Sequence, residues 1–317
     1  MNATLQSLRF VFVMMIFMSH FAYRGFTPFD AGGDCGVVFF FLLSGFTMSM
    51  GYGRSIADGS FRFSRYLKRR LLKVYPLHLL CLLLFLALFR PALDGALPVN
   101  ALLLQSWIPD SAYYFSYNGV SWFLSSLLFS YLLFPIAYRK GNALVLTVLL
   151  LFCLAVYVIV PYDRINALLY VSPLVRFVDF FLGIMLYKLF RSTPSLSVPN
   201  WIELLIVALL VLALWIYPYT DEKLRNAPLY WLVLLPLIFV FACQGGPISR
   251  LLQNSVLQWL GSLAMPIFLL HPMVFRVMTH FFPSIPTPLM LLTCFALVVA
   301  LSWTIHRTFN SSPSICP

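Results

Sequence analysis

Long apolar stretches recur along the whole chain and limit what it can fold into. Each is roughly twenty residues long, the length that an α-helix needs to cross a bilayer, and none alternates like a β-barrel strand. Only 10% of the 317 residues are charged and 61% are hydrophobic, whereas about a quarter of a soluble domain is charged. The sequence therefore predicts an all-α, polytopic membrane protein of about ten transmembrane helices. We expect them near residues 6–23, 34–52, 70–89, 119–138, 143–160, 172–190, 201–218, 228–243, 256–275 and 288–308.

The predicted helices are spread evenly, without a soluble domain or a long linker between them. Residues 1–317 are therefore expected to form a single integral-membrane domain. The six cysteines are dispersed and show neither CxxC nor metal-ligand spacing, so we expect no metal site and no disulfide framework. The first apolar stretch lacks a small-residue cleavage site, and we expect it to be retained in the mature protein.

Lysine and arginine are distributed unequally between alternate loops. If the N-terminus is inside, thirteen of them fall on the inner side and six on the outer side. This asymmetry predicts that both termini are cytoplasmic. The formal charge of +11 is most concentrated in one inter-helix segment, which indicates a membrane surface or an anionic cytoplasmic ligand rather than a nucleic acid.

The first helix carries one cation near its start and one imidazole near its end. Arg9 and His20 are eleven residues apart, which places them about 20° apart around a helix and about 16 Å apart along it. Ionisable groups within a spanning helix usually face a bundle interior or a water-filled cavity, and histidine suits proton transfer near neutral pH. Alternatively, Arg9 snorkels to the inner interface and His20 is a packing residue.

The second helix begins with a carboxylate on the same predicted side of the membrane as His20. Asp34 is therefore a candidate to orient the imidazole, as a carboxylate does in a catalytic triad. The alternative is a favourable interaction of Asp34 with the helix dipole. Farther along this helix, Ser44 lies in a glycine-bracketed stretch whose small residues allow close helix packing.

The most basic stretch runs from residue 61 to residue 76. Arg65, Arg69 and Lys73 are spaced i, i+4, i+8, and Arg70 is three residues before Lys73. One helical face is thus lined with cations. Anchoring to anionic lipid is the general interpretation. The alternative is a site for nucleotide phosphates, for which arginine supplies bidentate contacts and lysine a point charge.

Four further polar or amphipathic residues fall within predicted helices. Trp122 fits an interfacial aromatic anchor. Arg176 and Asp179 are i, i+3 neighbours that can pair, either beside a polar cavity or as a structural lock between helices. His271 lies toward the outer end of the ninth helix, on the side of His20, where it is either a proton relay or a packing residue.

Taken in order, the polar positions and their apolar surroundings resemble the acyltransferase-3 family of membrane-bound acyltransferases, which includes bacterial surface-glycan O-acetyltransferases. The resemblance covers nearly the whole chain and rests on Arg9 and His20 with ten residues between them, followed by GVVFFFLLSGF, RRLLKVYP, WFLSSLLFSYLLFP, RFVDFFLG and WLGSLAMPIFLLHP. Two departures from the family pattern stand out. Lys73 replaces the second arginine of the family's Arg-x-x-Arg, and Leu127 and Leu128 replace an acidic pair found in many members.

The resemblance implies an acyl-CoA donor, usually acetyl-CoA, bound from the cytoplasm at the inner membrane of a bacterium. It implies a sugar hydroxyl of a lipid-linked or exported glycan as the acceptor, with membrane lipid as the surroundings. His20 would be the catalytic base, assisted by Arg9 and Asp34. The phosphates of CoA would be held by Arg65, Arg69, Arg70 and Lys73, and the substrate path would be lined by Ser44, Trp122, Arg176, Asp179 and His271. Export of a glycan or lipid-linked sugar without acyl transfer is the alternative function.

Overall fold

The computed structural model describes residues 2–193 and 198–310. Regular structure in these residues is helical, apart from an isolated bridge between Tyr23 and Phe26. The longer helices are α1 (Ala3–His20), α2 (Gly32–Ala57), α3 (Phe63–Phe89), α6 (Trp122–Lys140), α7 (Ala143–Ile159), α8 (Pro173–Ser192), α9 (Asn200–Trp215), α11 (Pro228–Cys243), α13 (Ser255–Ser262), α14 (Ala264–Phe281) and α15 (Thr287–Asn310). Shorter helical segments are α4 (Ala96–Ala101), η1 (Gln105–Trp107), α5 (Ser111–Tyr114), η2 (Tyr162–Arg164), η3 (Asn166–Tyr170), η4 (Tyr217–Tyr219), α10 (Glu222–Asn226) and α12 (Pro247–Leu252).

Several of these helices have the length and apolar composition of membrane spans. Within the described residues there are seven such segments, namely α1, α2, α3, α6, the stretch Glu222–Cys243, α14 and α15. Helices α7 and α9 are apolar but shorter. The prediction of an all-α, multi-pass membrane protein is therefore confirmed. The count of about ten spans, the single domain over residues 1–317 and the cytoplasmic placement of both termini stay predictions.

Several predicted helix boundaries differ from those in the structure, among them the start of the third helix, which is Phe63 rather than residue 70, and two of the differences bear on the site. The helix expected over 256–275 is divided at Leu263 into α13 and α14. The first helix ends at His20 rather than at residue 23. The chain then turns with Arg24 and Gly25 in the left-handed region, at φ of 52° and 76°, a conformation that glycine adopts readily. His20 therefore lies at the carboxyl end of α1, next to a turn.

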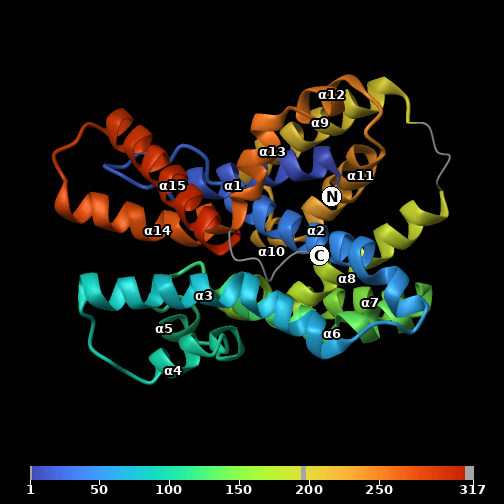
Figure 1. Ribbon diagram of the computed structural model, residues 1–317, viewed down its shortest axis with the longest axis horizontal. Coiled ribbons are helices and arrows are strands. Elements are labelled where there is room, and N and C mark those ends of the chain that lie inside the picture. The colour runs from blue at the N-terminus through green and yellow to red at the C-terminus, as the bar shows by residue number, and fades with distance from the viewer. Residues whose placement is uncertain (1, 194–197, 311–317) are drawn as a thin grey trace.

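Helices α1 and α2 occupy the middle of the bundle (Figure 1). α1 packs against α2, α13 and α14, while α2 packs most extensively against α8. Gly45 of α2 and Gly183 of α8 allow that second crossing, because a Cβ at either position would collide with a carbonyl oxygen of the facing helix. Close approach through small residues is the usual way in which helices pack in a bilayer.

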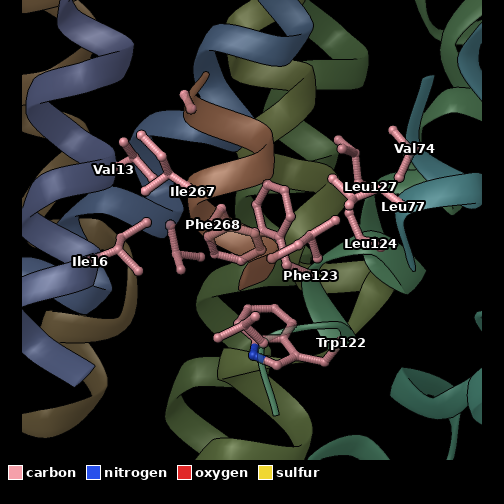
Figure 2. Packing of buried hydrophobic residues seen from close by; sticks show 14 of the residues in the cluster. Val13, Ile16, Val74, Leu77, Trp122, Phe123, Leu124, Leu127, Ile267 and Phe268 are labelled. Atoms are coloured by element: carbon pink, nitrogen blue, oxygen red, sulfur yellow. The ribbon is translucent and has the colours of Figure 1, made fainter. Parts of the chain in front are cut away.

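A buried apolar cluster joins α1, α3, α6 and α14 (Figure 2). Phe123 of α6 and Phe268 of α14 meet inside it, with their ring centroids 5.1 Å apart. Figure 2 shows these two side chains pointing toward one another. This aromatic pair, Phe123 with Phe268, forms part of the wall of the cavity described next.

Candidate active site

A cavity of about 490 Å³, called the main cavity below, lies between α1, α2, α3, α6 and α14. Three cationic side chains line it: Arg9 from α1, and Arg70 and Lys73 from α3. None of the described residues that line it is acidic. The rest of the wall is largely apolar and includes Phe123 and Phe268. A cavity of this composition suits a ligand that carries both negative charge and an uncharged arm.

Arg70 is held in place by a tyrosine from the neighbouring helix. Its Nη2 donates a hydrogen bond of 2.8 Å to the hydroxyl of Tyr52, and its guanidinium carbon lies 5.1 Å from the centre of the Tyr52 ring. The Nε atom of Arg70 is buried and has no hydrogen-bond partner in the described structure. Since an arginine can donate five hydrogen bonds in a fixed planar fork, this guanidinium keeps donor capacity for a ligand.

The other two cations reach the cavity from different sides. Arg9 is half-buried, and its Nη1 lies 3.4 Å from the side-chain oxygen of Gln6. Lys73 is exposed. Both Arg9 and Lys73 also line an adjoining cavity of about 210 Å³ between α1, α3, α14 and α15, where His306 is a further polar group. These two cations therefore lie where the two cavities meet.

The remaining basic residues of α3 face a separate pocket. Arg65 and Arg69 are exposed and line a shallow pocket of about 140 Å³, together with Arg62. Tyr52 is shared between this pocket and the larger cavity. The basic face expected from the sequence is thus divided. Arg70 lines the main cavity, whereas Arg65 and Arg69 line the shallow pocket beside it.

The structure brings His20 together with His271. The two ring centroids are 5.0 Å apart and the ring planes are inclined at 70°. His20 is exposed, and its Nδ1 lies 2.8 Å from the carbonyl oxygen of Ile16. His271 is buried, and its Nδ1 lies 3.1 Å from the carbonyl oxygen of Ile267. A carbonyl oxygen only accepts hydrogen bonds, so each Nδ1 carries the hydrogen and each Nε2 keeps a lone pair.

The described lining of the main cavity ends short of both histidines. It includes Phe268, whose ring centroid is 6.1 Å from that of His271. Phe268 of the aromatic pair therefore lies between the cationic cavity and His271. Arg9 reaches the cavity, whereas His20 lies at the far end of α1.

Asp34 is turned toward a different part of the molecule. Its Oδ2 accepts a hydrogen bond of 3.3 Å from the hydroxyl of Tyr217, and Arg225 lies 4.6 Å from the centre of the Tyr217 ring. Burial raises the pKa of Tyr217 to about 12, and the Asp34 carboxylate adds to the rise. The hydrogen bond that Asp34 accepts in the described structure thus comes from Tyr217 and not from His20, and a direct catalytic role of Asp34 stays a prediction.

The buried pair on α8 is bonded to several protein groups, although the Nε of Arg176 has no partner in the described structure. Arg176 and Asp179 are fully buried, with 2.7 Å between Nη1 and Oδ2. The Nη2 of Arg176 also donates to the carbonyl oxygens of Leu169 and Asn226, at 3.2 and 2.9 Å. Trp231 donates to the second carboxylate oxygen. These contacts join α8 to η3, α10 and α11, and they favour the structural lock over the substrate path.

Ser44 and Trp122 are the other two residues that were expected to line the substrate path. Ser44 lines the main cavity. Trp122 is buried at the start of α6 and packs against Tyr170, with 4.8 Å between ring centroids. Tyr52 and Phe268 were not singled out from the sequence, because each acts with a residue of another helix. No cluster of His, Cys, Asp and Glu within 2–193 and 198–310 is arranged to hold a metal ion.

Comparison with known proteins identifies the family. A family model described as an acyltransferase domain matches residues 2–307. The chain is also 36% identical over 117 residues to the protein named Acyltransferase MdmB of Streptomyces mycarofaciens, an alignment that covers 34% of this chain and 29% of that protein. No solved structure matches the chain. Since the family model spans nearly its whole length, the chain belongs to the acyltransferase-3 family.

Proposed function

We propose that the protein is an O-acyltransferase embedded in the bacterial cell membrane. It moves an acyl group, acetyl in the simplest case, from acyl-CoA bound at the cytoplasmic side to a hydroxyl of an extracytoplasmic or lipid-linked glycan. The family membership supports acyl transfer. The observation that carries the choice of donor is the cavity, which combines Arg9, Arg70 and Lys73 with an apolar wall and has no acidic residue in its described lining.

The chemistry of CoA matches the composition of this cavity. Its phosphates are multiply charged anions, and its pantetheine arm is long and mostly uncharged. The free Nε donor of Arg70 and the ammonium of Lys73 suit the phosphates, because charge-assisted hydrogen bonds are the strong ones. The apolar wall suits the arm, whose acyl end points toward Phe268. Passage of that end beyond the aromatic pair brings the thioester to His20.

His20 is suited to act as the general base. With Nδ1–H bonded to Ile16, its Nε2 is available to take the proton of the acceptor hydroxyl. The hydroxyl oxygen then bonds to the thioester carbonyl carbon, the carbon–sulfur bond breaks, and the imidazolium returns the proton to the departing sulfur. The products are an ester and the CoA thiol. A positioned base contributes roughly 100- to 10,000-fold to such a reaction.

Donor binding is tested by titrating detergent-purified protein with acetyl-CoA. Arg70→Ala is expected to weaken binding roughly 10- to 150-fold, the equivalent of one charge-assisted hydrogen-bonding group. Lys68→Ala removes a charge from an exposed position of the same helix, outside the described cavities, and is expected to leave the affinity unchanged. Sugar flux through the wild type without any binding of acetyl-CoA would instead establish the exporter.

Catalysis is tested separately from binding. His20→Ala is expected to bind acetyl-CoA like the wild type and to lose acylation of the surface glycan, measured by mass spectrometry. His280→Ala, an exposed histidine at the end of α14, is the matched control and is expected to stay active. Full activity of His20→Ala in correctly inserted protein would remove His20 from the mechanism.

A further inference from the structure

His271 holds a buried acceptor atom that the protein itself does not use. Its side chain is fully buried, and its Nε2 has no hydrogen-bond partner among the described residues. Buried polar atoms without a partner are destabilising and uncommon, so each one requires an explanation. Because Nδ1–H is bonded to Ile267, the unused atom is a lone pair that needs a donor.

The surroundings of His271 indicate where such a donor comes from. Three of its ring neighbours are phenylalanines, with centroids 6.2 Å away for Phe17, 6.1 Å for Phe268 and 5.8 Å for Phe275. The fourth is His20, which is closer and exposed. The phenylalanine rings have no hydrogen to give to the lone pair, so a donor approaches from the side of His20.

The two histidines also share one tautomer. In each ring the carbonyl oxygen four residues earlier fixes the hydrogen on Nδ1, so His20 and His271 each present an accepting Nε2. Two acceptors do not satisfy one another. A single hydroxyl carries one hydrogen, so a substrate that satisfies both nitrogens must bring two hydroxyls.

We propose that His271 is a second substrate-binding imidazole, whose Nε2 receives a hydroxyl adjacent to the one that gives its proton to His20. This inference rests on the proposed function and narrows the acceptor to a compound with neighbouring hydroxyls, such as a sugar ring with a free diol. His271 then positions the reacting hydroxyl on His20 and discriminates against an acceptor that lacks the second hydroxyl.

Three substitutions separate this role from a structural one. The side-chain oxygen of glutamine reaches the place of Nε2, whereas asparagine reaches only the place of Nδ1, and phenylalanine keeps the ring shape without either. Transfer is followed as the initial rate of label incorporation from radiolabelled acetyl-CoA into the glycan of isolated membranes. His271→Gln is expected to retain most of the rate, while His271→Asn and His271→Phe lose roughly three- to tenfold, the range for one hydrogen bond.

The binding of acetyl-CoA distinguishes failure of this inference from failure of the proposed function. All three variants are expected to bind acetyl-CoA like the wild type, and an inactive wild type would overturn the proposed function itself. Equal rates for all three variants, or an active His271→Asn beside an inactive His271→Gln, would overturn the role of Nε2. The position of the ester, read by NMR of the product glycan, is expected to be next to a free hydroxyl. An ester without a neighbouring hydroxyl would overturn the inference that the acceptor carries a diol.

Discussion

The crossing of α2 and α8 is tight enough that one methyl group should destabilise the protein. A Cβ added to Gly45 would lie 1.9 Å from the carbonyl oxygen of Phe180, whereas ordinary contact begins near 3.4 Å. The two helices would therefore have to separate by about 1.5 Å, since the atom that is met belongs to the backbone and not to a flexible side chain. The collision is reciprocal, because a Cβ at Gly183 would lie 2.0 Å from the carbonyl oxygen of Leu42.

The expected cost of Gly45→Ala is about 2–3 kcal/mol, the upper part of the range for overpacked cores. The free energy of unfolding is measured by titrating the protein in mixed micelles with a denaturing detergent. Gly51→Ala on the same helix is the matched control, because no atom lies within 4 Å of its added Cβ. That variant should gain about 0.5–1 kcal/mol, since alanine is the better residue inside a helix. A Gly45→Ala protein as stable as Gly51→Ala would refute the close crossing.

Two further predictions concern polar contacts. Removing one partner of the buried pair, as in Arg176→Met, should cost about 3–5 kcal/mol, and adding Asp179→Leu should recover most of that loss. If the two substitutions instead lowered the free energy of unfolding additively in the same titration, the pair would not act as a structural lock between helices. Tyr52→Phe removes the hydrogen bond to Arg70 but keeps the ring, so acetyl-CoA should bind roughly two- to tenfold more weakly. A loss as large as that of Arg70→Ala would show that Tyr52 does more than hold the guanidinium.

The fold class could be predicted from the sequence because span length and apolar composition are local properties. Packing partners could not, since a helix surrounded by lipid or by other helices is apolar on every side and carries no amphipathic stripe to show which face is buried. The split of the ninth predicted helix at Leu263 illustrates the limit. The apolar pattern continues through the break, whereas Pro266, in the first turn of α14, has no N–H to bond the carbonyl oxygen of Ser262 and so favours a new helix start there.

The sequence predicted only part of the candidate site, because residues from different helices meet there. The spacing of Arg70 and Lys73 indicated cations on one helical face, and both line the main cavity. The same spacing grouped Arg65 and Arg69 with them, yet these two lie in a neighbouring pocket. Contacts between distant helices, such as Tyr52 with Arg70, leave no trace in a single sequence.

Leu127 and Leu128 stand where the family resemblance leads us to expect an acidic pair, and this difference bears on the cavity lined by Arg9, Arg70 and Lys73. Leu127 lines the cavity, and Leu127, Leu128 and Arg70 line a small adjacent space of about 10 Å³. A carboxylate in either place would lie beside the Arg70 guanidinium and would use its hydrogen-bonding capacity in a buried ion pair. With leucine there, Arg70 bonds instead to the neutral Tyr52 hydroxyl and keeps its full positive charge toward the cavity. The leucines thus favour the binding of an anion beside Arg70.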